Sequence, residues 1–180
     1  MSVWRKRILR FFRDPAQGEA LTEVLSARAC REGWLQGQLF RWMRRAHPRS
    51  GFEVNKRRAK VLFDISADDA PMVGELKVLG SGYQTKVVGG ALRDLASRLD
   101  RPVTANDAAA TYRWGLLKDY SRLMQPGVQS DTDRILVLVV ADPEDDTMLG
   151  RVLTGIRFQG VEQRVEGDRW LAKVWSLDPG

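Results

Sequence analysis

The stretch V-L-F-D-I-S-A-D-D-A-P-M-V-G-E-L-K-V-L, from Val61 to Leu79, decides the fold that the sequence predicts, because it indicates two strands joined by a polar turn. The turn falls at 66–71, where S-A-D-D-A-P supplies residues that favour chain reversal. Side chains alternate between the two faces of a strand, so Asp64 is expected to point away from Phe63 and Ile65.

The second strand carries an acid and a base on one face. Glu75 and Lys77 alternate with the apolar Leu76 and Val78, so the hairpin is expected to present them beside Asp64. Two carboxylates at short range repel each other unless a cation lies between them, and Mg²⁺ often binds through one or two carboxylates. An ammonium group at the same place can orient a water or neutralise charge on a phosphate. The alternative is a surface hairpin with a weak exposed ion pair, since Glu-x-Lys is a common sequence.

Asp64, ten intervening residues and then the E-L-K segment at 75–77 resemble the motif of the PD-(D/E)xK nuclease superfamily, which has the restriction-endonuclease-like fold. The helical stretch from Arg31 to Ala46 is similar to the acidic helix that opens that fold, and 91–99 resembles the helix behind the active strands. The similarity covers about residues 30 to 140, and three or four positions carry its chemistry. The chain departs from the motif at Phe63, which replaces the proline before the aspartate.

The resemblance implies an α/β protein with a mixed central sheet flanked by helices, and a Mg²⁺-dependent endonuclease that hydrolyses DNA phosphodiester bonds, with Mn²⁺ able to substitute. It assigns the metal to Asp64, Glu75 and the carbonyl of Leu76, and assistance of the attacking water to Lys77. Glu32 is the third carboxylate that the resemblance places at the site, with a solvated surface glutamate as the alternative. A second hypothesis keeps the fold without the chemistry, as a catalytically silent nucleic-acid-binding or assembly subunit of a larger complex.

Length and composition limit the class of protein. A chain of 180 residues with 43% apolar and 29% charged residues is typical of one globular domain, and its net charge of +6 favours a polyanionic partner. No apolar run approaches the roughly 18 residues of a membrane span. A single cysteine, Cys30, is compatible with a reducing cytoplasm, and a single histidine, His47, leaves little for a zinc site or a catalytic triad.

The N-terminal segment 1–14 is expected to form a basic amphipathic helix ahead of a nuclease-like domain over 15–180. Trp4, Ile8, Phe11 and Phe12 recur at helical spacing among five Lys and Arg residues. Its aromatic face is interpreted as packing on the domain, on a second copy in a homodimer or on a partner protein, because exposed aromatic residues often mark an interface. Contact with phosphates is a second interpretation, and contact with an anionic membrane surface is the least expected.

Residues 41–60 concentrate positive charge just before the Asp64 strand, and Glu53 is the one acid among them. Such charges neutralise phosphates without reading sequence, so they are expected to surround the metal site and hold DNA there, with a solvated basic surface as the alternative. The residues predicted to bind nucleic acid are Arg45, Lys56, Arg57, Arg58, Gln84 and Lys86.

The rest of the chain predicts further elements of an α/β fold. Residues 112–124 place apolar residues at a four-residue interval, as one face of a helix does. The aliphatic run from Asp133 to Ala141 is typical of a central strand covered on both faces. Val161 to Val165 and Trp170 to Leu177 flank Gly167 and predict a hairpin.

Overall fold

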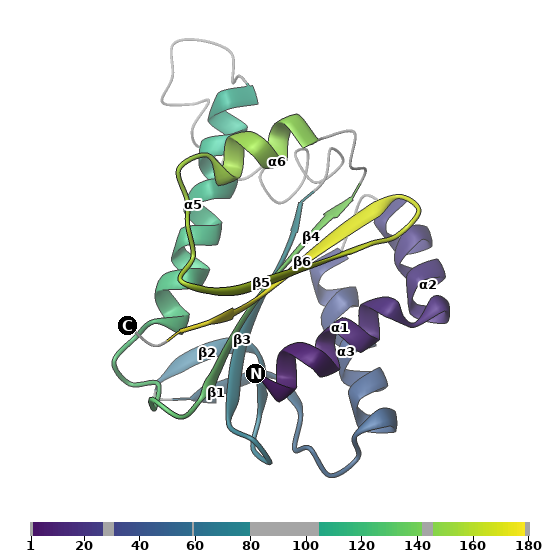
Figure 1. The fold of residues 1–180 in the computed structure, drawn as a ribbon, viewed down its shortest axis with the longest axis vertical. Coiled ribbons are helices and arrows are strands. Elements are labelled where there is room, and N and C mark those ends of the chain that lie inside the picture. Colours follow the sequence, from purple (N-terminus) through teal and green to yellow (C-terminus); the bar gives the residue numbers. More distant parts are fainter. Residues whose placement is uncertain (1, 27–30, 59, 80–104, 142–145, 179–180) are drawn as a thin grey trace.

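A computed structural model describes residues 2–26, 31–58, 60–79, 105–141 and 146–178, and it has three layers (Figure 1). One mixed sheet lies between two groups of helices, which confirms the α/β class and the flanked central sheet. One face is covered by α1 (Val3–Arg13), α2 (Pro15–Ser26) and α3 (Arg31–Ala46), and the other by α5 (Ala105–Leu123) and α6 (Asp146–Leu153). The helix expected over 91–99 lies outside the described residues.

The sheet has six strands in the order β1-β2-β3-β4-β6-β5. The strands are β1 (Glu53–Arg58), β2 (Val61–Ala67), β3 (Met72–Leu79), β4 (Asp133–Ala141), β5 (Gly160–Glu166) and β6 (Trp170–Leu177). Strands β3 and β4 are parallel, and every other neighbouring pair is antiparallel. The aliphatic run of β4 lies inside the sheet and is buried from both sides, and β5 and β6 form the expected hairpin.

The hairpin of β2 and β3 is paired only at its turn end. The antiparallel register covers the three residues of β2 from Ile65 to Ala67, and Ile65 faces Gly74. A Cβ atom on Gly74 would lie 2.7 Å from Cγ1 of Ile65 and 2.9 Å from the carbonyl oxygen of Ile135, so glycine lets three strands approach closely at this point.

Beyond this point β2 departs from regular alternation. Phe63 packs in the core on the α5 side, whereas Ile65 packs in the core on the α1 side. The prediction that these two side chains share a face is therefore wrong. The change of face occurs across Asp64, where pairing of β2 with β3 has ended. On its other edge β2 still pairs with β1 at Phe63 and Ile65, but the ladder is irregular between them, because Asn55 of β1 has a left-handed backbone with a φ of 51°.

Helix α1 is part of the core on its side of the sheet. Trp4, Ile8, Phe11 and Phe12 are at most 2% exposed and pack with residues of α2, α3 and the strands. The Trp4 indole N–H also donates to the carbonyl of Ala70. The aromatic side chains of α1 thus contact the domain itself and are not exposed for a partner.

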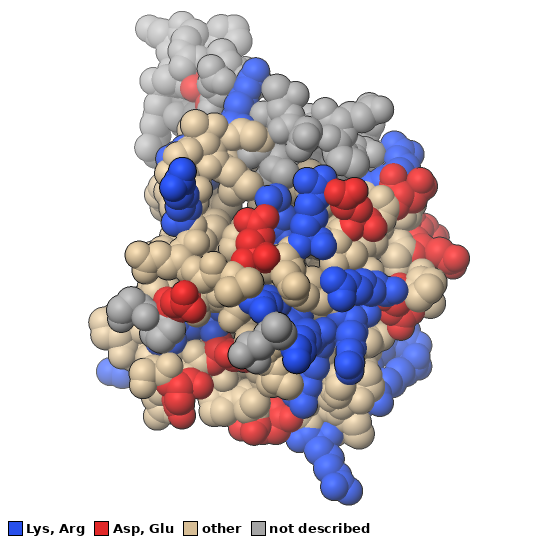
Figure 2. Space-filling model, viewed as in Figure 1, with Lys and Arg blue, Asp and Glu red and all other residues tan. Residues whose placement is uncertain are grey.

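The basic side chains of α1 other than Arg5 lie outside this core, whereas Arg5 is 3% exposed and donates to the Val161 carbonyl. Figure 2 shows Lys and Arg grouped over α1 on the viewed face, with Asp and Glu around them. Lys6, Arg10 and Arg13 are exposed, whereas Arg7 pairs with Asp69 at 3.2 Å. Within the described ranges no helix combines the length and apolar composition needed to cross a membrane.

The connection from α5 to β4 is held by a buried arginine. The Arg134 guanidinium donates to four backbone carbonyls, those of Leu123, Val128, Gln129 and Thr132, at 3.0 to 3.3 Å. Backbone carbonyls satisfy this buried charge, and the Leu123 carbonyl is at the negative end of the α5 dipole. This loop therefore has a defined shape.

Candidate active site

Six charged side chains from four elements meet beside the middle of β3, and we call them the β3 cluster. They are Glu32 of α3, Asp64 of β2, Glu75 and Lys77 of β3, and Asp119 and Arg122 of α5. The structure thus brings together all four residues that the sequence predicts as catalytic. Glu75 and Lys77 are two residues apart on one strand and so share the face that α5 covers.

Asp64 reaches the cluster because β2 and β3 separate beside it. Its Oδ2 accepts a hydrogen bond from the backbone N–H of Leu76 at 2.8 Å. The side chain thus takes a donor that a continued ladder with β2 would have used. This bond fixes the carboxylate at the edge of β3.

Glu75 is the most buried acid of the β3 cluster, with an exposed fraction of 1%. Its Oε2 lies 3.4 Å from Nη1 of Arg122, and its Oε1 has no hydrogen-bond partner among the described residues. Burial, the charges of Asp64 and Asp119 and a hydrogen bond with the Asp64 carboxyl raise the pKa of Glu75 to about 9. Glu75 is therefore protonated at neutral pH.

Lys77 is a fixed cation between two acids. Its Nζ lies 2.9 Å from Oδ2 of Asp119 and 3.5 Å from Oε2 of Glu32. Burial alone would lower the pKa of Lys77, but the two carboxylates outweigh burial and raise the pKa above its ordinary value. Lys77 thus stays protonated at neutral pH and can donate hydrogen bonds, but it is not a base.

The two α5 members of the cluster were missed by the sequence interpretation. Asp119 contacts Lys77, and Arg122 pairs with both Asp119 and Glu75 at 3.4 Å. A signal for Asp119 was present, because it falls between Leu116 and Leu123 on the apolar face of its helix, where a charge needs a partner. Burial raises the pKa values of Glu32 and Asp119, and Lys77 opposes the rise in both.

The described residues that are predicted to bind nucleic acid lie on α3 and on β1. Arg45 lies near the C-terminal end of α3, about 20 Å along the helix from Glu32 at ~1.5 Å per residue. Arg45 and Arg57 are exposed, while Lys56 and Arg58 pair with acids in what we call the β1 cluster. The β1 cluster consists of Glu53, Lys56, Arg58 and Asp68. Gln84 and Lys86 lie outside the described residues.

The donor set at Asp64 and Glu75 fits Mg²⁺. Both side chains supply oxygen, which this ion prefers, and the buried Oε1 of Glu75 lacks a hydrogen-bond donor. Across the described part of the chain, no three His, Cys, Asp or Glu side chains form a preassembled metal cage. Two carboxylates still suffice, because Mg²⁺ keeps several waters and usually takes only one or two from the protein.

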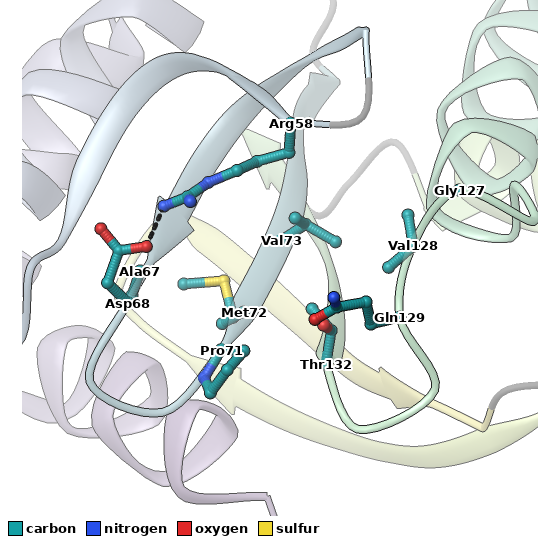
Figure 3. Close-up of a pocket in the computed structure, with 10 residues that line it drawn as sticks. All are labelled: Arg58, Ala67, Asp68, Pro71, Met72, Val73, Gly127, Val128, Gln129 and Thr132. Atoms are coloured by element: carbon teal, nitrogen blue, oxygen red, sulfur yellow. Dashed lines mark hydrogen bonds and ion pairs between the residues drawn. The ribbon is translucent and has the colours of Figure 1, made fainter.

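A separate pocket of about 380 Å³ lies between the β2–β3 turn and the loop after α5 (Figure 3). None of its ten lining residues belongs to the β3 cluster. It lies on the same face of the sheet, however, because Val73 in its wall is two residues before Glu75 on β3.

Comparisons of the chain with protein-family models, with curated proteins and with solved structures give no match. The geometry of the β3 cluster is therefore the main guide to function. It unites two adjacent carboxyls, a fixed ammonium group and an arginine at one edge of a strand. Such charge arrangements are common at catalytic sites, although ion-pair networks with a structural role also produce them.

Proposed function

We propose that the protein is a Mg²⁺-dependent endonuclease that hydrolyses DNA phosphodiester bonds with a site of the PD-(D/E)xK type. The observation that carries the proposal is the contact of the Asp64 and Glu75 carboxyls beside the Lys77 ammonium group. The order of elements supports it, because a helix with Glu32 precedes β1, the Asp64 strand and the Glu75 strand. That is the order which the resemblance to this superfamily implies.

The metal would be held by Asp64, Glu75 and the carbonyl of Leu76. The N–H and C=O of a strand residue point to the same edge, and the Leu76 N–H is directed to Asp64. The Leu76 carbonyl is therefore directed toward the same carboxylate. When bound, the ion supplies a water of lowered pKa and neutralises charge on the phosphate, and Mn²⁺ is expected to substitute.

The protein's cations have distinct roles in this proposal. Lys77, oriented by Asp119 and Glu32, donates to the attacking water or to a phosphate oxygen and stabilises the charge that develops there. Arg122 is more exposed than its partner Glu75, so it is placed to contact the phosphate at the rim. Displacement of the Glu75 proton frees that carboxylate for its role as a ligand.

The test is cleavage of supercoiled plasmid with Mg²⁺, with Mn²⁺ and with a chelator. Asp64→Asn and Glu75→Gln keep the shape of the side chains, and each is expected to lower cleavage by about 100-fold or more. Glu162→Gln is the matched control, because Glu162 is an ion-paired acid on β5 outside the cluster. Parent-like cleavage by both cluster variants, with melting temperatures near that of the parent, would remove the basis of the proposal.

A catalytically silent nucleic-acid-binding or assembly subunit is the second candidate. The ion pair of Arg122 with Glu75 favours it, because a proton and an arginine already compensate the two carboxylates without a metal. DNA binding by the purified chain, with no Mg²⁺-dependent nicking and no rise in melting temperature on adding Mg²⁺, would favour this candidate.

A further inference from the structure

The pocket in Figure 3 has the form of a binding site beside the β3 cluster. Val73 in its wall and Glu75 in the cluster are two residues apart on one face of β3, a separation of about 7 Å at ~3.3 Å per residue. That distance corresponds to about two base-pair steps along the axis of duplex DNA, at ~3.4 Å per step. A strand with its phosphate at Glu75 therefore passes the pocket within a few nucleotides.

The walls of the pocket combine apolar and polar groups. Met72, Val73 and Val128 supply apolar surface, and the Arg58–Asp68 ion pair closes one side. Gln129 and Thr132 stand on the opposite side in Figure 3. The Arg58–Asp68 pair and these two side chains supply both hydrogen-bond donors and acceptors.

The wall that carries Gln129 and Thr132 is fixed in shape. The backbone carbonyls of both residues accept from the buried Arg134 guanidinium at 3.3 and 3.2 Å. The Val128 carbonyl accepts from the same group at 3.0 Å. This bonding orders the loop without using the amide of Gln129 or the hydroxyl of Thr132, and a preorganised wall lowers the entropy cost of binding.

A ligand that matches this lining has an apolar body and an edge with both donors and acceptors. A nucleobase has that chemistry, and about 380 Å³ is within the range of small-ligand pockets. A base enters such a pocket only when it is out of the helical stack, so the ligand is an unpaired or extruded base.

We propose that the pocket formed by Arg58, Asp68, Met72, Val73, Gln129 and Thr132 binds one unpaired base of the DNA strand whose phosphate lies at the β3 cluster. This inference rests on the proposed nuclease function for the position of the strand. It makes the substrate class DNA with a bulged, frayed or mismatched base near the cut, and it makes the pocket the element that selects it.

The experiment measures binding and cutting separately with the full chain. Binding is measured without Mg²⁺ on three matched duplexes, which are fully paired, have one unpaired adenine, or have an abasic site at that position. The parent is expected to bind the duplex with the unpaired adenine about 10-fold more tightly than the other two. Cleavage with Mg²⁺ is expected to show the same order of rates.

Two variants test the pocket itself. Val128→Trp fills it and is expected to reduce the 10-fold preference to about 1, while affinity for paired DNA stays at the parent level. The matched control is Val161→Trp, since Val161 is exposed on β5 and absent from the pocket lining. Gln129→Ala changes an exposed loop side chain and is expected to lower the preference about 3-fold without affecting folding, so it decides the matter if Val128→Trp is unstable.

The outcomes separate the two proposals. Cutting by the parent with equal affinity for all three duplexes would overturn the base pocket and leave the nuclease intact. A preference for the unpaired adenine that Gln129→Ala reduces, in a chain that never cuts, would support the pocket and overturn the nuclease. A preference that survives both Gln129→Ala and a folded Val128→Trp would show that another surface reads the unpaired base.

Discussion

The β3 cluster and the β1 cluster look alike in the sequence and differ in the structure. Each contains an acid and a base two or three residues apart on one strand, Glu75 and Lys77 on β3 and Glu53 and Lys56 on β1. In the β3 cluster the side chains of Glu75 and Asp119 are 1% and 6% exposed, whereas Asp68 in the β1 cluster is 54% exposed. The comparison teaches that burial decides which charged group has a strongly shifted pKa, and a local sequence motif does not encode burial.

The two clusters differ in how much each charged side chain contributes to stability. An exposed ion pair is screened by water and contributes about 0 to 1 kcal/mol to stability. A buried group of charges depends on each member, because removing one leaves the others desolvated and uncompensated. The β3 cluster has more acids than bases, with Glu32, Asp64, Glu75 and Asp119 around Lys77 and Arg122. The proton on Glu75 reduces that excess.

The largest effect is expected from Lys77→Met, which keeps the length of the side chain and removes the buried cation. Asp119 and Glu32 would lose the partner at 2.9 and 3.5 Å, so we expect a loss of about 3 to 5 kcal/mol in the free energy of unfolding at pH 7. Urea denaturation measures it. If Lys77→Met lowered the free energy of unfolding no more than Lys56→Met, the same change in the exposed β1 cluster, burial would not distinguish the two clusters.

A smaller effect of opposite sign is expected from Glu75→Gln, which mimics the protonated acid. The pKa of Glu75 is about 9 in the folded protein and near 4.5 when unfolded, so the folded state binds more protons between these values and the parent loses stability as pH rises through that window. At pH 8.5 we expect the variant to exceed the parent by roughly 2 to 4 kcal/mol, less than the full ~1.4 kcal/mol per pKa unit because neighbouring charges adjust. Below pH 4.5 the two should agree.

The measurement for Glu75→Gln is a series of denaturant titrations from pH 4 to pH 9. Its control is Glu162→Gln, for which no window of this kind is expected because that acid is exposed on β5. Parallel pH curves for parent and Glu75→Gln would show that the buried acid holds no extra proton. Glu75→Gln should gain stability and lose cleavage together, as expected where a functional residue lowers the stability of the fold.

The smallest effect is expected in the β1 cluster. Asp68→Asn removes the acid shared by Lys56 and Arg58, and we expect a change within about 1 kcal/mol that decreases further in 0.5 M salt. Thermal denaturation at low and high salt measures it. A loss comparable to that of Lys77→Met would show that exposure does not separate the two clusters.

Much of the fold was predictable because its signals are local. The aliphatic run of β4, the β5–β6 hairpin and the helical range Arg31–Ala46 follow from periodicity and turn residues. The irregular course of β2 at Asp64 was not predictable, because the close approach at Gly74 that accompanies it is a tertiary contact.

The site was predictable only where residues are close in sequence. Glu75 and Lys77 could be placed on one face from the strand period alone, and the placement of Glu32 came from the resemblance. Asp119 and Arg122 lie forty or more positions beyond β3 and reach it through the packing of α5. An acid on an apolar helical face indicates burial with a partner, but no local rule names that partner.

The docking of α1 has a consequence for how the chain folds. The first residues make contacts far along the sequence, from Ser2 to Asp133, from Trp4 to Ala70 and from Arg5 to Val161. During synthesis this helix leaves the ribosome before the strands that receive it, so its five large apolar side chains stay unburied until those strands emerge. Deleting residues 1–13 would therefore leave a chain that aggregates during expression, because the strip of sheet beneath the helix would have no cover.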